Sequence, residues 1–189
     1  MKILITGVHG FVGSNLVNYL KKNNIIYGLD IVSPQKDGVI KTYSWQDLDS
    51  DAIPEADAII HLAGKAHDTK NQAEAKTYFD INTELTKKIY DYFLKKNISK
   101  FIFFSSVKAA ADSVVGDILT EDITPSPKGP YGESKIAAEK YILSKPTDKK
   151  VYILRPCMIH GPGNKGNLNL LYSVVSKGIP WPLGAFDNH

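Results

Sequence analysis

Three tyrosines in this sequence are each followed, four residues later, by a lysine, and such a pair can abstract a proton. The pairs are Tyr92 with Lys96, Tyr131 with Lys135, and Tyr141 with Lys145. On a helix the two side chains share one face, about 6 Å apart along the axis, so the ammonium can stabilise a tyrosinate. Lowering a tyrosine pKa of about 10 by about 3 units, or about 4 kcal/mol, would give a useful base at neutral pH. Because the chain has 10 tyrosines and is rich in lysine, spacing alone does not identify a catalytic pair.

The position of each pair along the chain favours Tyr131. It follows Pro130 at the start of a predicted helix, and the predicted strand before it ends at Ser105 and Ser106. In an open α/β sheet, ligands bind beyond the carboxyl ends of the strands. The other two tyrosines lie late in their predicted helices, where the pair is most simply a surface contact. We therefore predict Tyr131 as a base, Lys135 as its stabilising cation and Ser106 as a hydrogen-bond partner of the substrate oxygen. Capping of the strand end by the serines is the alternative.

A glycine-rich segment, "TGVHGFVGS", lies between the first predicted strand and the first predicted helix. In a dinucleotide-binding loop, Gly7 supplies the tight turn, Gly10 the close approach to a pyrophosphate, and Gly13 the packing of the helix on the sheet. Phe11 and Val12 begin the helix, whose first N–H groups and dipole attract an anion. This context predicts a dinucleotide-binding loop, with an ordinary glycine-rich turn as the alternative.

The second predicted strand ends at Asp30, 20 residues after Gly10. A carboxylate at this place accepts hydrogen bonds from the adenosine ribose and repels a 2′-phosphate, which favours NAD over NADP. The only arginine, Arg155, is distant in sequence, and Lys36 is a poor substitute for it as a phosphate ligand. A solvated loop carboxylate is the alternative interpretation of Asp30.

Short apolar runs alternate with helical patterns, which predicts an α/β fold with a parallel sheet covered on both faces. The expected strands are Lys2–Thr6, Ile25–Asp30, Val39–Tyr43, Ala58–Leu62, Phe101–Ser105 and Val151–Leu154. The expected helices are Phe11–Lys22, Ala73–Lys96, Tyr131–Ser144 and Leu168–Ser176. The segment Val107–Gly129 is expected to be a long loop, and loops of this length are usually functional.

Composition excludes several classes of protein. The 189 residues suffice for one domain with a sizeable core, and the net charge of +3 is too small to indicate a nucleic-acid partner. No apolar run approaches the roughly 20 residues that span a bilayer, so no membrane partner is expected. The single cysteine, Cys157, excludes an internal disulfide and fits a reducing, cytoplasmic location. His61, His67 and His160 lack metal-ligand spacing, so no metal is expected.

Together these segments resemble the extended short-chain dehydrogenase/reductase family, in order and over essentially the whole chain. The matching pieces are "TGVHGFVGS", Asp30, "HLAG" at 61–64, Asn82 in "DINTELT", "FFSSV", "YGESK" and "LRPCMIHGPG". The resemblance implies a Rossmann-type doubly wound sheet that binds NAD. The cofactor contacts it implies are the glycine segment, Asp30, Leu62, Ala63, Gly64 and Lys135. It assigns Tyr131 as the catalytic base, with Lys135 and Ser106 beside it.

Among extended members, the chain most resembles nucleotide-sugar epimerases and reductases of bacterial surface polysaccharide pathways. This resemblance implies a UDP- or dTDP-sugar substrate. The function expected is an NAD-dependent 4-epimerase of a UDP-hexose or UDP-N-acetylhexosamine, acting through a transient 4-keto sugar. A 4-keto-sugar reductase that consumes NAD(P)H and a non-catalytic NAD-binding sensor are the alternatives. A homodimer is one assembly open to the full-length form.

The chain departs from the family pattern at several positions. Val107 and Lys108 stand where dehydratases carry an Asp-Glu pair, so dehydration is not expected. Met158 and His160 replace an asparagine and a tyrosine of many sugar epimerases, which leaves the exact substrate open. Asn167 resembles a contact to the substrate diphosphate, and a plain helix cap is the alternative.

The expected domains are an NAD-binding Rossmann domain over residues 1–165 and, over residues 166–189, the start of a truncated substrate-binding region. The sequence stops where family members enter their smaller lobe, so most of that lobe is expected to be absent. We expect apolar surface near Trp181 and Leu183. We also expect the chain to bind NAD but to turn over UDP-sugars negligibly.

Overall fold

A computed structural model describes residues 1–189 except 51, 66–73, 115, 165–166 and 179–189. The chain divides into two compact units, Met1–Cys157 and Met158–His189. Within the described residues, no helix is both long enough and apolar enough to cross a membrane. The functions expected of residues 1–165 and 166–189 stay predictions, and Trp181 and Leu183 lie outside the described residues.

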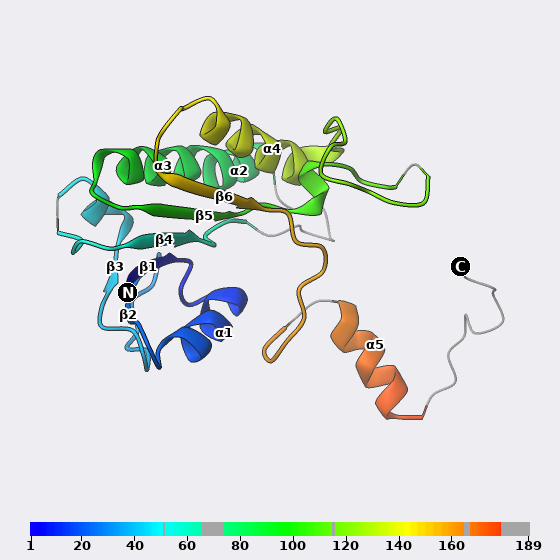
Figure 1. Cartoon of the computed structure of the whole chain (residues 1–189). Helices are drawn as coiled ribbons and strands as arrows, with labels where there is room; N and C mark the ends of the chain where they lie inside the picture. Colours follow the sequence, from blue (N-terminus) through cyan, green and yellow to red (C-terminus); the bar gives the residue numbers. More distant parts are fainter. Residues whose placement is uncertain (51, 66–73, 115, 165–166, 179–189) are drawn as a thin grey trace. The chain divides into compact units, whose positions relative to one another are not determined.

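The first unit is built on a six-stranded sheet in which every neighbouring pair is parallel (Figure 1). The strands are β1 (Lys2–Thr6), β2 (Ile25–Leu29), β3 (Thr42–Tyr43), β4 (Ala58–His61), β5 (Lys100–Phe104) and β6 (Lys150–Leu154). Their order is β3-β2-β1-β4-β5-β6, which is the order of a doubly wound dinucleotide-binding sheet. The predicted Rossmann-type fold is therefore confirmed.

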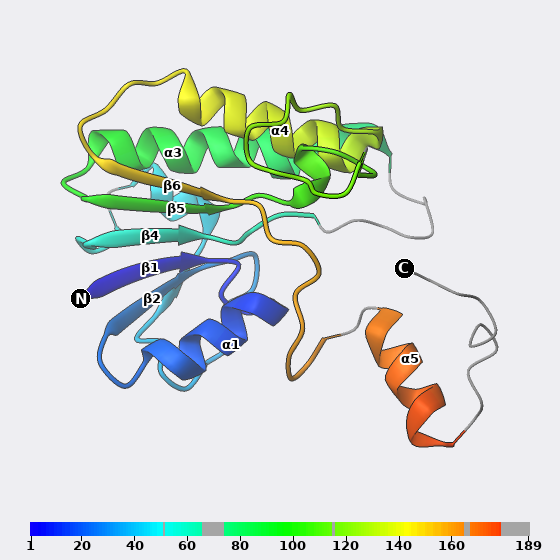
Figure 2. The same cartoon turned by 45° about the vertical axis from the view of Figure 1, so that its right-hand side comes forward.

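Helices cover the two faces of this sheet unequally, as Figures 1 and 2 both show. On one face lies α1 (Phe11–Leu20). On the other lie α2 (Ala75–Tyr78), a π-helical segment (Phe79–Glu84), α3 (Leu85–Lys95) and α4 (Gly129–Leu143). Two 3₁₀ turns, Trp45–Leu48 and Val107–Ala109, follow β3 and β5. The second unit contains α5 (Asn167–Ser176).

The core consists of two apolar layers, one on each side of the sheet. The larger layer lies against α3 and α4 and includes Ile59, Phe93, Phe101 and Phe103, all fully buried. The smaller lies under α1 and comprises Ile3, Ile5, Val8, Val17 and Ile26. Because β1 and β4 contribute side chains to both layers, the middle of each strand is apolar.

Three predicted boundaries are wrong, each for a local reason. The expected strand Val39–Tyr43 is observed as Thr42–Tyr43. Val39 closes a turn by donating to the Lys36 carbonyl (3.0 Å), while the Ile40 N–H and the Lys41 carbonyl already bond to β2. The expected single helix 73–96 is interrupted by the π-helical segment. The expected loop 107–129 contains a 3₁₀ turn and a short bridge between residues 111 and 126, and α4 begins at residue 129.

Candidate functional site

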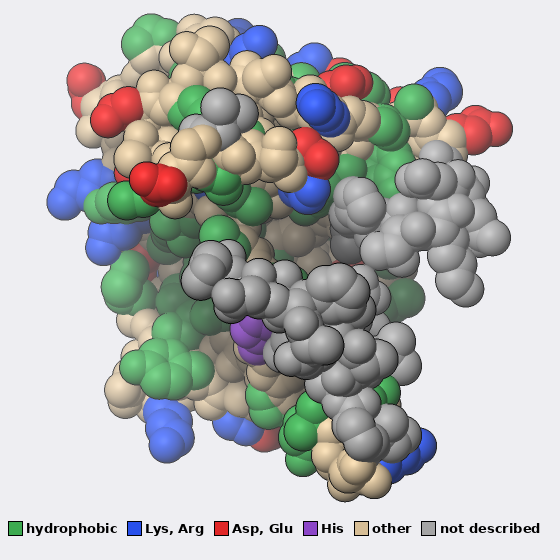
Figure 3. All heavy atoms as spheres, turned by 90° about the vertical axis from the view of Figure 1, so that its right-hand side faces the viewer, with side chains coloured by type: hydrophobic (Ala, Val, Ile, Leu, Met, Phe, Trp, Pro, Cys, Tyr) green, Lys and Arg blue, Asp and Glu red, His purple; other side chains and the backbone are tan. Residues whose placement is uncertain are grey.

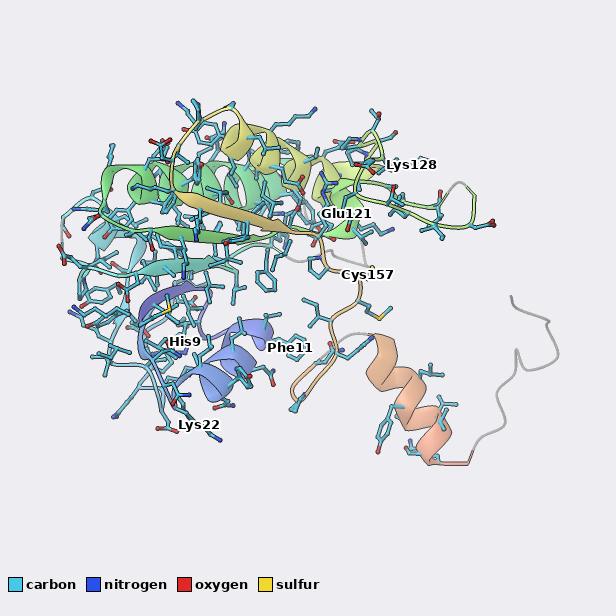
Figure 4. All side chains as sticks on the ribbon, viewed as in Figure 1. His9, Phe11, Lys22, Glu121, Lys128 and Cys157 are labelled. Carbon is cyan, nitrogen blue, oxygen red and sulfur yellow. The ribbon has the colours of Figure 1, made fainter. Side chains whose placement is uncertain are left out.

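The carboxyl ends of the strands bring the predicted site residues to one edge of the sheet. Figure 3 faces this edge, and described hydrophobic side chains are visible on the left half of the view with charged ones scattered around them. Figure 4 shows His9 in the glycine-rich loop and Phe11 at the start of α1, both reached directly from the end of β1. The glycine-rich loop and the catalytic candidates therefore belong to one edge of one sheet.

The glycine-rich loop packs so closely on its neighbours that side chains are excluded at two positions. Gly7 has φ +68°, and a Cβ there would lie 2.9 Å from the Ala63 nitrogen. A Cβ at Gly13 would lie 2.3 Å from the Gly7 carbonyl oxygen. Both distances are below any real contact, so the predicted roles of a tight turn at Gly7 and close helix packing at Gly13 match the backbone.

The first turn of α1 is open to an anion. Gly10 is the N-cap residue and offers no side chain to cap the helix. An α-helix leaves its first N–H groups without partners in the helix, here those of Phe11, Val12 and Gly13, and they carry the positive end of the dipole. This backbone geometry fits the pyrophosphate of a dinucleotide.

Asp30 lies next to this loop, directly after β2. Its Oδ2 accepts a hydrogen bond from the His9 N–H (3.0 Å) and its Oδ1 one from the Ile31 N–H (2.8 Å). A carboxylate has about four acceptor positions, so about two are left for ribose hydroxyls. Lys36 donates to the Ser14 hydroxyl at 2.8 Å. This lysine, predicted to be a poor substitute for an arginine ligand of a 2′-phosphate, therefore lies at the first turns of α1.

A buried network ties the end of β1 to the segment after β4. The Thr6 hydroxyl accepts from the N–H groups of Leu62 (3.1 Å) and Ala63 (3.0 Å) and lies 2.6 Å from His61 Nδ1. His61 Nε2 lies 2.8 Å from the Thr86 hydroxyl, which itself donates to the Asn82 carbonyl at 2.7 Å. The Thr86 hydroxyl must therefore accept from Nε2–H, while Nδ1 accepts from Thr6. His61 is thus a neutral structural residue, and complete burial lowers its pKa to about 3.

The three catalytic candidates lie together at the same edge. The Tyr131 hydroxyl is hydrogen-bonded to the Ser106 side chain, and the Ser106 oxygen also accepts from the Lys108 N–H (3.2 Å). Lys135 lies one helical turn beyond Tyr131, is buried, and donates to the Phe104 carbonyl at 3.1 Å. Burial raises the pKa of Tyr131, an effect that the hydrogen bond from Ser106 opposes, and burial lowers the pKa of Lys135 to about 8.

Asn82 and Gly64 join this cluster to the cofactor loop. The Asn82 side chain accepts from the Lys65 N–H (2.8 Å) and donates to the Ser134 hydroxyl (3.0 Å). A Cβ at Gly64 would lie 2.9 Å from Asn82 Oδ1 and 3.1 Å from Lys135 Nζ. Only glycine therefore lets the segment after β4 pass directly over Lys135. Asn82 lies in the π-helical segment. The hydroxyl of the next residue, Thr83, donates to the Ser134 carbonyl (2.8 Å).

The other two tyrosine–lysine pairs have structural surroundings. The Tyr141 hydroxyl donates to Asp91 at 2.7 Å, and this bond raises the pKa of Tyr141 to about 12. Tyr92 is buried in the larger core layer. In both pairs the lysine lies over the ring of its own tyrosine, 5.6 Å from the Tyr92 centroid and 5.3 Å from the Tyr141 centroid. Neither pair lies with a serine at a strand end.

The sequence patterns did not predict some residues of the site. Gly132 lets α4 approach the turn after Ser106, since a Cβ there would lie 2.4 Å from the Lys108 carbonyl oxygen. Glu139 is buried four residues after Lys135 and forms an ion pair with the half-buried Arg155. The signals available in the sequence were a glutamate four residues after Lys135 and an arginine directly after an apolar strand.

Asn167 begins α5, but its side chain is outside the described part of the chain, as is His67. Among described residues, no group of three or more His, Cys, Asp or Glu could hold a metal.

The geometry agrees with comparisons to known proteins. Residues 3–179 match the model of the NAD dependent epimerase/dehydratase family. UDP-glucose 4-epimerase of Vibrio cholerae is 31% identical over 99% of this chain and 60% of its own length. GDP-6-deoxy-D-mannose reductase of Pseudomonas aeruginosa is 28% identical over 87% of this chain and 54% of its own length.

Solved structures are similar over the same range. The structure of MoeE5 with UDP-glucose and NAD has a TM-score of 0.77 and 25% identity, and the match covers 94% of this chain and 62% of that one. UDP-glucuronic acid 4-epimerase from Bacillus cereus with NAD has a TM-score of 0.76 at 24% identity, covers 94% of this chain and 64% of its own, and shows the fold alone. The chain spans about three-fifths of the length of these relatives. It belongs to the NAD-dependent epimerase/dehydratase family, a group of short-chain dehydrogenase/reductase enzymes with NAD as cofactor.

Proposed function

We propose that the protein to which this chain belongs is an NAD-dependent nucleotide-sugar 4-epimerase. The substrate is a UDP-hexose or a UDP-N-acetylhexosamine, and the reaction passes through a transient 4-keto sugar. The observation that carries the proposal is the cluster of Ser106, Tyr131 and Lys135, in which the Tyr131 hydroxyl is bonded to Ser106 beside a buried lysine. The similarity to UDP-glucose 4-epimerase of Vibrio cholerae supports the substrate class.

The cofactor is held by backbone and by one carboxylate. The pyrophosphate binds at Gly10, Phe11, Val12 and Gly13, where the first turn of α1 presents its N–H groups. Asp30 accepts hydrogen bonds from the adenosine ribose. The segment Leu62, Ala63 and Gly64, which lies on Gly7 and on Lys135, runs along the nicotinamide half, and Lys135 donates to the second ribose.

The chemistry assigned to this chain's residues is proton transfer at the sugar 4-hydroxyl. Tyr131 takes the proton, Ser106 donates a hydrogen bond to the same oxygen, and the Lys135 ammonium stabilises the tyrosinate. Bound NAD would supply the acceptor and donor of the C4 hydride, and its positive ring would lower the pKa of Tyr131. Because burial alone raises the pKa of Tyr131, the residue becomes a good base only in the cofactor-bound state.

A second candidate function, a 4-keto-sugar reductase, is favoured by the similarity to GDP-6-deoxy-D-mannose reductase. A non-catalytic NAD sensor is disfavoured, since it has no need of the Tyr131 cluster. Dehydration is also disfavoured, since Val107 and Lys108 occupy the place of the acid–base pair and the Lys108 ammonium is paired with Asp112. A dTDP-sugar as substrate, a diphosphate contact by Asn167, a homodimer and a cytoplasmic location stay predictions.

The experiment that tests the proposal gives the full-length protein a panel of UDP-sugars with and without NADH. An epimerase forms the C4 epimer with no added reductant and no net loss of NADH. Stoichiometric NADH loss on a 4-keto substrate would establish the reductase instead. Binding of NAD with no conversion of any sugar would favour the sensor.

The choice of cofactor is tested separately on this chain. We expect tighter binding of NAD than of NADP, because Asp30 repels a 2′-phosphate. Asp30→Ala should weaken NAD about tenfold and narrow the gap between the two cofactors, since a charge-assisted hydrogen bond contributes about 1.5–3 kcal/mol. Dissociation constants from calorimetry measure both effects. Tighter NADP binding by the unaltered chain would refute the role given to Asp30.

A further inference from the structure

A carboxylate with almost no exposure lies behind the catalytic cluster. The Glu139 side chain is 1% exposed. Its two oxygens each accept from Arg155 Nε at 3.1 Å, Oε2 also accepts from Nη2 at 2.6 Å, and Oε1 accepts from the Ser105 hydroxyl. Burying a charge is costly unless it is paired and hydrogen-bonded. The ion pair meets that condition, but an apolar residue of similar size would pack there without the cost.

The three bonded residues lie on α4 and at the ends of β5 and β6, and the first two of these elements carry the catalytic cluster. Glu139 lies on α4, four residues beyond Lys135 and thus on the same helix face. Ser105 follows β5 and immediately precedes Ser106, and its N–H donates to the Leu154 carbonyl at 2.7 Å. Arg155 follows β6, next to Pro156, whose carbonyl accepts from the Val107 N–H at 3.1 Å. Moving the carboxylate would therefore loosen both sides of Ser106 relative to α4.

The charges around Lys135 leave Glu139 as its supporting anion. On α4 itself, the neighbouring titratable groups are Tyr131 and Glu139. From β4, His61 faces the lysine but is neutral, and from the end of β6 comes Arg155, which is cationic. Burial lowers the pKa of Lys135, and among the charges acting on it the one that raises its pKa is Glu139.

We propose that Glu139 is a positioning residue of this site: its carboxylate aligns Ser106 with Tyr131 by way of Ser105 and Arg155, and it keeps the buried Lys135 charged. The catalytic consequence rests on the proposed function, whereas the contacts and charges do not. Glu139 does not touch the substrate oxygen. It acts on the reaction through the lysine and the serine.

The test measures the ionisation of Tyr131 directly on this chain with saturating NAD and no sugar. Tyrosinate absorbance is followed against pH, and the signal of Tyr131 is the difference between each protein and the same protein carrying Tyr131→Phe. Glu139→Gln keeps the size and the hydrogen-bond acceptor but removes the charge. We expect it to raise the pKa of Tyr131 by about one unit, because Lys135 then loses its proton more easily. The matched control is Glu133→Gln, an exposed glutamate on the same helix, which should leave the titration unchanged.

A second variant separates charge from folding. In Glu139→Gln with Arg155→Met, both charges of the pair are gone, so no unpaired arginine is left to repel Lys135. We expect a shift smaller than in Glu139→Gln alone but still measurable, because the supporting anion is still missing. If the single variant does not fold, the titration of the double variant decides between the two outcomes. A Tyr131 titration that stays within about 0.2 units of the unaltered chain in the folded variants would overturn the proposal.

The same variants in the full-length enzyme report on catalysis. Glu139→Gln should lower kcat about tenfold at neutral pH with KM nearly unchanged, and should move the pH dependence of kcat to higher pH. A loss confined to KM would contradict the positioning role. Because the titration uses no sugar, its result stands even if the epimerase assay fails. An active epimerase in which Glu139→Gln leaves the Tyr131 titration unshifted would overturn the role of Glu139 but not the proposed function.

Discussion

The centre of the sheet, at β1, and its edge strand β6 are covered to very different degrees. In β1, Leu4 is 0% exposed and lies in the larger core layer, whereas on β6 Tyr152 is 47% and Leu154 is 43% exposed. The α4-facing residues of β6, Val151 and Ile153, do pack on the larger core layer, so the exposure is confined to one face of the strand. Described elements of the chain thus cover β1 and the glycine-rich loop on both faces, whereas they leave the outer face of β6 exposed. Stability and cofactor geometry should therefore depend on the β1–β4 side.

The largest effect is expected from adding a methyl group to the glycine-rich loop after β1. Gly7→Ala should cost about 4 kcal/mol of unfolding free energy and abolish NAD binding, because its Cβ would lie 2.9 Å from a backbone nitrogen. Gly129→Ala is the matched control, since Gly129 also has a positive φ (+80°) but its Cβ would meet nothing within 4 Å. That change should cost only the backbone strain, about 1–2 kcal/mol. Equal costs in urea unfolding would mean that the close approach of the loop is not what stabilises it.

A pair of leucines tests the difference in packing. Leu4→Ala on β1 should cost about 3 kcal/mol, because it leaves a cavity in the larger core layer. Leu154→Ala on β6 should cost less than about 1 kcal/mol, because that side chain is already 43% exposed. Denaturant unfolding of the two variants measures both costs. A cost at Leu154 as large as that at Leu4 would show that the outer face of β6 is covered.

An effect smaller than the loss of the Leu4 side chain is the pH dependence carried by His61. Its folded pKa of about 3 lies below the usual value of about 6.5, so the unfolded chain binds its proton first as pH falls. The stabilisation is present above pH 6.5 and decreases below it, by about 2 kcal/mol between pH 6.5 and pH 5. The variant His61→Gln should flatten this part of the stability curve, and His160→Gln, at an exposed site, should not. An unchanged slope in His61→Gln would rule out the buried histidine as its source.

The sequence predicted those features that depend on local patterns. The glycine spacing after a strand, the apolar strands and the helix start near Tyr131 all reappear in the structure, because backbone freedom and burial on both faces constrain nearby residues. The π-helical turn at Asn82 and the Glu139–Arg155 pair did not follow from the sequence. Each depends on contacts between elements far apart in the chain, such as Asn82 with Ser134, and no local periodicity encodes them.

Of the three tyrosine–lysine pairs, we propose that of Tyr131 as the catalytic one, because its hydroxyl is bonded to Ser106 beside the buried Lys135. The most direct test compares Tyr131→Phe, Tyr92→Phe and Tyr141→Phe in the full-length enzyme, with turnover of UDP-sugar and the NAD dissociation constant measured for each. Tyr131→Phe should lower turnover by about 10²–10⁴-fold while NAD binding stays nearly unchanged. The other two should retain turnover, since Tyr141 is bound to Asp91 and Tyr92 lies in the core. Full turnover in Tyr131→Phe, or equal losses in all three variants, would contradict the assignment of Tyr131 as the base.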